Sequence, residues 1–336
     1  MLLVLMVIAI VLTYIFTFIN GMHDGCNVVA TIISSRSMKP RNALLIACAS
    51  ELIGPLFIGT AVADTVGKGV IKYQYLNSPG NIIPVVTILS ALIGSICWNL
   101  FTWKIGLPSS SSHALLGSML GAGIAAYGLN SIEYYSFFWK VIVCMFASPV
   151  IGFIIGYIFM KISIILLKDS NPKVNKLIKK IQILSMIFLG TSHGSSDGQK
   201  SAGVIALLLV IGQMQTKFTV PKWTIFTSDI FIVAGILLGG WNIIKTVGSK
   251  IYKVQPLHSL NTQLSSASVI FAASLLGAPV STTHIVSSSI IGIGSAERIN
   301  AVNWLKVRSI LLSWLTTIPM SALAGMLSFY IINIFI

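Results

Sequence analysis

Gly21-Met-His-Asp24-Gly25 is a short polar stretch inside apolar sequence, and a second version of it, Gly194-Ser-Ser-Asp197-Gly198, occurs later in the chain. After each version comes a run of hydroxyl side chains that begins with proline and ends with histidine: Gly106-Leu-Pro-Ser-Ser-Ser-Ser-His113 in the first half and Gly277-Ala-Pro-Val-Ser-Thr-Thr-His284 in the second. From Asp to His the separation is 89 residues in the first half and 87 in the second. Duplicated polar motifs in hydrocarbon-like sequence are typical of a secondary transporter, whose substrate site lies near the bilayer midplane.

The composition is that of an integral membrane protein. Hydrophobic residues make up 55% of the 336 residues and charged residues 9%, whereas soluble domains carry about 25% charged residues. Met1 to Ile19 lacks the basic start and the cleavage site of a secretory signal, so we expect it to remain as a span. We predict an all-α polytopic protein with helices over 2–19 (continuing to 35), 42–62, 82–105, 108–127, 137–160, 181–212, 226–244, 258–276, 280–294 and 305–333.

The positive charges predict the topology. The net charge is +14, but the Lys and Arg residues lie mainly in short connections between the apolar segments. This distribution is typical of membrane topology under the positive-inside rule and does not favour nucleic-acid binding. Segment 161–180 carries six lysines, and we expect it to be a cytoplasmic linker between a first inverted repeat, 1–160, and a second, 181–336. This topology places both termini outside the cell membrane and gives each half an odd number of crossings, so the halves are inverted.

Two segments, 82–127 and 258–294, have a Gly-x-Pro motif at their centre. Each is either two full crossings or one re-entrant hairpin. The polar tip favours the hairpin, because non-helical backbone at membrane depth occurs only where protein or a water-filled cavity covers it.

The repeated aspartates are the strongest candidates for a functional site, because a carboxylate at bilayer depth is costly unless it is paired or lines a polar cavity. We expect Asp24 and Asp197 to lie in broken helices, with the neighbouring glycines permitting the breaks. The alternative is a structural carboxylate, for which Lys200 is a partner three residues after Asp197. Glu51 is a further candidate for ion coupling, whereas Asp229 is expected to be solvated near a span end.

The hydroxyl runs predict an anion site. Pro108 and Pro279 suit the first turns of the following helices, and free N–H groups with Ser and Thr donors bind tetrahedral oxyanions. Helix capping and close helix packing are the alternative roles for these hydroxyls. The candidate anion ligands are Ser109, Ser110, Ser111, Ser112, Ser281, Thr282 and Thr283.

Four of the five histidines belong to the repeated motifs, and we expect them to support helix breaks by hydrogen bonding: His23, His113, His193 and His284. Their spacing is not that of a zinc site, and the four cysteines have no C-x-x-C spacing. No metal other than a coupling ion is predicted.

These motifs resemble those of the inorganic phosphate transporter family over almost the whole chain. The residues that carry the resemblance are His23-Asp24-Gly-Cys-Asn27, Ser192-His193-Gly-Ser-Ser-Asp197-Gly-Gln199-Lys200-Ser201 and the two hydroxyl runs. The resemblance implies an ion-coupled symporter that uses Na⁺ or H⁺ to import phosphate and needs no other cofactor. It also implies that Asp24, Asn27, Asp197 and Gln199 belong to the broken helices of the site. His23 and Ser196 stand where the family usually has Asn, so the coupling ion stays open.

The resemblance leaves sulfate as a second candidate substrate, because the family includes sulfate permeases. Phosphate fits better, since its P–OH groups can donate hydrogen bonds to Asp24 or Asp197, whereas sulfate only accepts them. A passive anion channel is also compatible with the motifs. An intramembrane hydrolase built from Ser, His and Asp is disfavoured, because a single nucleophile does not require a duplicated arrangement. The sequence leaves the oligomeric state open, homo-oligomers included.

Overall fold

The computed structural model describes residues 1–56, 59–78, 81–239 and 241–336, and over these ranges the secondary structure is helical apart from one isolated bridge between Ile71 and Ile132. The predicted all-α fold is confirmed. Residues 57–58 and 240, which belong to two of the expected helices, lie outside the described residues, as do 79–80. The longer helices are α1 (Leu2–His23), α2 (Cys26–Ser34), α3 (Pro40–Ile53), α4 (Ala61–Lys68), α6 (Ile83–Ile105), α7 (Ser111–Tyr127), α9 (Cys144–Leu166), α10 (Val174–Ile211), α11 (Lys222–Leu238), α13 (Pro256–Leu275), α14 (Thr282–Arg298) and α15 (Trp304–Ile334).

Several helical segments are long and apolar enough to cross a bilayer. Within the described ranges they are Leu2–Ser34, Ile83–Ile105, Tyr134–Leu166 and Trp304–Ile334, and α11 with the bent segment after it is a fifth if the pair counts as one span. The chain is therefore a multi-pass membrane protein. α10 is absent from this group because polar residues fill its middle.

The predicted helix breaks are largely wrong. Between α1 and α2 only Asp24 and Gly25 interrupt the helix, and both keep right-handed dihedral angles. In the second half α10 runs unbroken for 38 residues through Asp197.

The glycines beside the aspartates serve close helix packing instead. A Cβ on Gly21 would lie 2.1 Å from the carbonyl oxygen of Ile232, and one on Gly194 would lie 2.3 Å from that of Glu51. Side-chain-free positions let neighbouring backbones approach in membrane bundles. The same residues that suggested a break therefore let α11 pack on α1 and α3 on α10.

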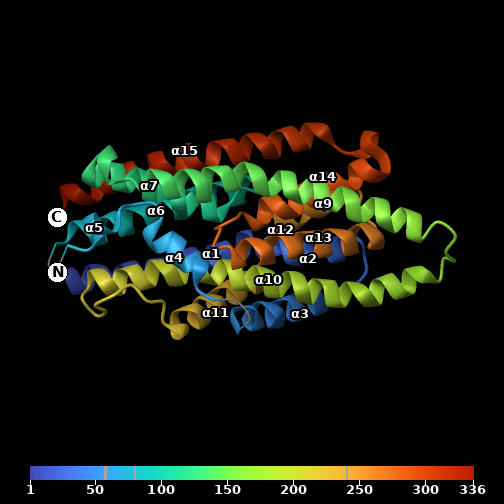
Figure 1. Cartoon of the computed structure of the whole chain (residues 1–336), viewed down its shortest axis with the longest axis horizontal. Coiled ribbons are helices and arrows are strands. Elements are labelled where there is room, and N and C mark those ends of the chain that lie inside the picture. The colour runs from blue at the N-terminus through green and yellow to red at the C-terminus, as the bar shows by residue number, and fades with distance from the viewer. Residues whose placement is uncertain (57–58, 79–80, 240) are drawn as a thin grey trace.

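The two segments with Gly-x-Pro motifs form helical hairpins. α6 and α7 pack together, as do α13 and α14, and the pairs approach the middle of the molecule from opposite ends of its long axis (Figure 1). Both chain termini lie at the end occupied by α6 and α7, whereas the α9–α10 connection lies at the other end (Figure 1). α9 and α10 extend into the expected basic linker, so only 167–173 of segment 161–180 is non-helical.

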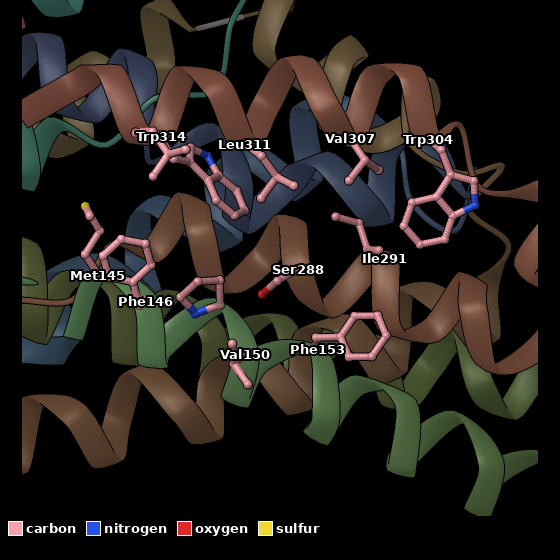
Figure 2. A pocket seen from close by; sticks show the side chains of 12 residues that line it. Met145, Phe146, Val150, Phe153, Ser288, Ile291, Trp304, Val307, Leu311 and Trp314 are labelled. Atoms are coloured by element: carbon pink, nitrogen blue, oxygen red, sulfur yellow. The ribbon is translucent and has the colours of Figure 1, made fainter. Parts of the chain in front are cut away.

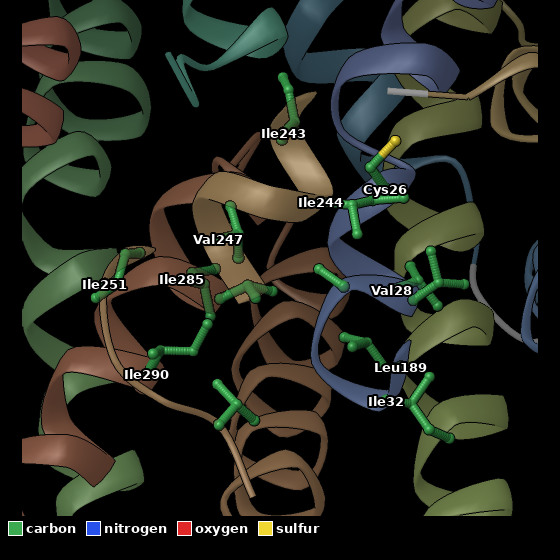
Figure 3. Packing of buried hydrophobic residues seen from close by; sticks show 14 of the residues in the cluster. Cys26, Val28, Ile32, Leu189, Ile243, Ile244, Val247, Ile251, Ile285 and Ile290 are labelled. Carbon is green, nitrogen blue, oxygen red and sulfur yellow. The ribbon is translucent and has the colours of Figure 1, made fainter. Parts of the chain in front are cut away.

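Each hairpin has its own apolar core. One cluster joins Val28 and Ile32 of α2 to Leu189 of α10 and to Ile285 and Ile290 of α14 (Figure 3). A second cluster surrounds α6 and α7 at the other end of the long axis. The polar motifs lie between these two cores, where the hairpin tips meet.

Candidate functional site

Both hairpin tips turn in the same way. Gly106 lies directly after the end of α6, and Gly277 lies just after the end of α13. Both glycines adopt left-handed dihedral angles, each with φ of 67°. Ser110 and Ser281 then cap the next helices, each accepting a 3.2 Å hydrogen bond from the backbone N–H of the histidine three residues later. The prolines lie before these caps and not in the first helical turn, so that expectation is wrong.

Asp24 is buried between the two tips. Its Oδ1 accepts a hydrogen bond of 2.5 Å from Thr283 Oγ1, and its Oδ2 accepts one of 3.3 Å from the backbone N–H of Ser111 at the start of α7. His23 Nδ1 lies 3.1 Å from Oδ1. Asn27 donates from Nδ2 to Thr283 Oγ1 over 2.8 Å. The carboxylate from the first half is thus held by both tips.

Asp197 has a fixed cation as its partner. Lys200 Nζ lies 2.6 Å from Oδ1 and also donates to Ser112 Oγ over 2.5 Å. Asn20 of α1 donates to Asp197 Oδ2 over 3.1 Å, and His193 Nε2 lies 3.5 Å from the same oxygen. The second aspartate therefore also contacts residues of the first half, directly through Asn20 and through Lys200 to the first tip.

Two more predicted residues lie in the polar centre but away from the tips. Glu51 is buried on α3, and its carboxylate lies 2.9 Å from His193 Nδ1. Gln199 accepts hydrogen bonds from the backbone N–H groups of Val62 and Ala63 at the start of α4, and it donates to the Ser195 carbonyl oxygen. These hydrogen bonds of Gln199 go to α4 and to its own helix, not to a hairpin tip.

The histidines at the tips contact aromatic rings. His113 and His284 have ring centroids 4.9 Å apart, and His284 stacks on Trp314 of α15 at 4.1 Å. The ring nitrogens of His113 have no hydrogen-bond partner among the described residues, so the expected hydrogen bonding is not found at this tip. Trp314 Nε1 donates to the Pro108 carbonyl oxygen over 3.1 Å, so it fastens α15 to the first tip.

Two serines of α10 have the spacing of a hydrolase nucleophile but not its structural setting. Ser192 and Ser196 each occupy the middle of a Gly-x-Ser-x-Gly pattern, in 190–194 and 194–198. In hydrolases this pattern forms a sharp turn between a strand and a helix that exposes the serine. Here both serines are buried within a continuous helix, so the pattern does not form such a turn.

Sequence reasoning missed several residues of this centre. Asn20 lies one helical turn before Asp24, a signal that was available. Asp229 is buried, contrary to expectation, because α11 packs its face against Gly198 of α10, and its carboxylate oxygens have no hydrogen-bond partner in the described part of the chain. Trp314 could not be identified from the duplicated motifs, since it has no counterpart in the first half.

An apolar cavity of about 440 Å³ lies apart from this centre. α9, α14 and α15 line it, and Ser288 is the polar side chain that Figure 2 shows in it. Trp314, which stacks on His284, also lines this cavity, but most of the lining side chains are apolar and do not suit a hydrated anion.

The chain is similar to known phosphate transporters along its whole length. The model of the Phosphate transporter family matches residues 20–173 and 164–325. A probable low-affinity inorganic phosphate transporter of Bacillus subtilis (strain 168) is 38% identical over 334 residues, covering 99% of this chain and 98% of the relative. One of the same name from Rhizobium meliloti (strain 1021) is 39% identical over 328 residues, covering 97% and 96%. A solved structure described as the sodium-dependent phosphate transporter shares the fold, with a TM-score of 0.88, 24% identity, and coverage of 99% of this chain and 100% of that one.

Proposed function

The chain belongs to the phosphate transporter family, and from this membership and the geometry of the polar centre we propose that it imports inorganic phosphate together with Na⁺ or H⁺. The relatives described above are named as phosphate transporters, and none of those names mentions sulfate. These names support phosphate as the cargo, and the buried carboxylates of the polar centre support a cation that travels with it.

The observation that carries the proposal is the exchange of contacts between halves. Asp24 of the first half contacts Thr283 of the second tip, and Lys200, paired with Asp197 of the second half, contacts Ser112 of the first tip. A single site built from two repeats is what alternating access requires, since rocking of one repeat against the other exposes it to each side in turn.

Unpartnered hydroxyls supply the anion ligands. Ser111 Oγ and Thr282 Oγ1 occupy matching positions at the starts of α7 and α14, are buried, and have no hydrogen-bond partner among the described residues. Two helix N-termini with free hydroxyl donors suit a tetrahedral oxyanion. The remaining hydroxyls of the two runs, Ser109, Ser110, Ser112, Ser281 and Thr283, complete this polar lining, and the aspartates accept hydrogen bonds from the P–OH groups.

Cation binding offsets the negative charge of the site and thereby couples phosphate transport to cation transport. Lys200 already pairs with Asp197, but Asp24 and an anion in the same buried site repel one another strongly unless a mobile cation binds with them. Asn27 Oδ1 is a buried oxygen without a hydrogen-bond partner in the described part of the chain, so it is available as a Na⁺ ligand beside Asp24. Asn20 Oδ1 is likewise buried and unpartnered, and Asn20 lies one helical turn before Asp24. Glu51 is a further coupling residue if the ion is H⁺.

The positions of the basic residues determine the membrane topology that we propose. Repeats 1–160 and 181–336 are inverted, 161–180 faces the cytoplasm, both termini lie outside the cell membrane, and the α6–α7 and α13–α14 hairpins are re-entrant. The opposite approach of the hairpins supports this arrangement (Figure 1).

Uptake of radiolabelled phosphate into proteoliposomes tests the function. We expect uphill accumulation that requires an imposed Na⁺ or pH gradient. Uptake that never exceeds equilibrium would indicate a channel, uptake of sulfate in place of phosphate would overturn the substrate, and release of phosphate from an ester would indicate a hydrolase.

A further inference from the structure

Lys200 and Asn27 are equivalent residues of the two halves. Each follows its aspartate by three positions, in Asp24-Gly-Cys-Asn27 and Asp197-Gly-Gln-Lys200. Asn27 Nδ2 donates to the Thr283 hydroxyl over 2.8 Å, and Lys200 Nζ donates to the Ser112 hydroxyl over 2.5 Å. Thr283 and Ser112 are themselves equivalent, since each immediately precedes the histidine of its tip. The two residues make the same contact, but only Lys200 carries a charge.

The surroundings of the Lys200 ammonium are those of a bound cation. Nζ lies 2.6 Å from Asp197 Oδ1, 2.5 Å from Ser112 Oγ and 3.3 Å from the Val280 carbonyl oxygen. Carboxylate, hydroxyl and carbonyl oxygens are the ligands that hard metal cations take in proteins. An ammonium has three N–H donors and therefore satisfies all three oxygens. Lys200 is 1% exposed, so this charge is enclosed with its partners.

Asp24 has no such partner. Among the described residues its ion-pair contact is with His23, whose other ring nitrogen lies 3.3 Å from Thr102 Oγ1 and 3.4 Å from Ser109 Oγ. A neutral ring that carries its proton on Nδ1 satisfies these contacts, since Nδ1 donates to the carboxylate and Nε2 accepts from a hydroxyl. The charge of Asp24 is then left for a mobile cation, with Asn27 Oδ1 as an available ligand.

We infer that the Lys200 ammonium is a tethered cation that replaces a mobile coupling ion in the second half. The mobile ion at the aspartate pair then binds only in the first half, at Asp24 and Asn27, and each transport cycle moves one cation fewer than a site with two amides would move. This inference rests on the proposed function, because it concerns the number of ions that accompany phosphate.

Lys200→Asn tests it by giving the second half the amide that the first half has. The initial rate of phosphate uptake into proteoliposomes is measured against Na⁺ at fixed pH and against pH at fixed Na⁺. For the coupling ion we expect the Hill coefficient to rise from about 1 in the wild type to about 2 in the variant, since it can approach the number of cooperating sites. Added ammonium chloride should partly restore uptake at low coupling-ion concentration, because NH₄⁺ fits the vacated oxygens.

The reciprocal and control variants make the test decisive. Asn27→Lys should abolish the cation dependence, because it places a second ammonium beside Asp24, whereas exposed Lys104→Asn should leave the Hill coefficient unchanged. If Lys200→Asn cannot be purified folded, Lys200→Gln and Asn27→Lys give the same comparison.

Three results would overturn the inference. One is an unchanged Hill coefficient in the Lys200 variants, which would make Lys200 an ordinary ion-pair partner. Another is a loss of phosphate binding that saturating cation does not restore, which would make it a phosphate ligand. The third is an Asn27→Lys variant with wild-type cation dependence. Failure of the proposed function is distinguishable, because the wild type itself would then show no cation-driven phosphate uptake.

Discussion

Thr283 Oγ1 lies 2.5 Å from Asp24 Oδ1, although 259 residues separate the two in sequence. The hydroxyl donates to the carboxylate and accepts from Asn27 Nδ2, so both of its hydrogen-bonding roles are used within the site. Three elements are thereby fixed together: the two helices on either side of Asp24 and the first turn of α14.

Thr283→Val is expected to lower the kcat/KM of phosphate uptake about 10- to 100-fold, because a hydrogen bond to a charged group contributes about 1.5–3 kcal/mol. Thr283→Ser should retain most activity. Thr31→Val is the matched control, since the Thr31 hydroxyl is buried but has no hydrogen-bond partner among the described residues. Equal uptake by Thr283→Val and the wild type would remove the hydroxyl from the site.

Asp24→Asn and Asp197→Asn are each expected to abolish uptake while leaving the protein folded in detergent. The first variant removes the charge that is proposed to attract the coupling ion, and the second removes the carboxylate that pairs with Lys200. Uptake and size-exclusion profiles are compared with those of Asp64→Asn, which changes a half-exposed carboxylate. Near-normal uptake by either site variant would show that its carboxylate is structural.

Cysteines at Ser110 and Thr282 test whether the two tips share one site. In a background in which Cys26, Cys48, Cys97 and Cys144 are replaced, each new thiol is expected to react with an impermeant reagent in a state-dependent manner. Saturating phosphate should protect both. Labelling of both positions from one face only, without protection, would contradict a shared midplane site.

Gly21→Ala and Gly194→Ala are expected to destabilise the protein by about 1–3 kcal/mol, because overpacking of a tight contact forces backbone shifts. Each new methyl would meet a backbone carbonyl at 2.1 or 2.3 Å. Gly59→Ala is the control, since a Cβ there meets nothing within 4 Å. Thermal unfolding in detergent measures the difference, and equal melting temperatures for all three variants would show that the helices separate without cost.

The sequence was sufficient to predict most of the long helices and the meeting of the two tips, but the helix expected over 42–62 ends at Ile53, and α4 (Ala61–Lys68) was not predicted. Long apolar runs predict spans because the bilayer requires them, and duplication indicated that Asp24 and Thr283 serve one centre. The unbroken α10 was not predictable, because glycine suits both a helix break and a close helix contact. Asp229 was misjudged because its burial depends on how α11 packs, which its distance from a span end does not reveal.

The contact between Asp24 and Thr283 also has a consequence for biosynthesis. A ribosome adds about 5–20 residues per second, so Thr283 is made about 13–52 s after Asp24, given the 259 residues between them. During that time Asp24 has neither Thr283 nor the rest of the second hairpin tip as a partner. His23, its sequence neighbour, is present from the start and can bind the carboxylate at once. The final partners of the first aspartate are therefore synthesised only when most of the chain has already been made.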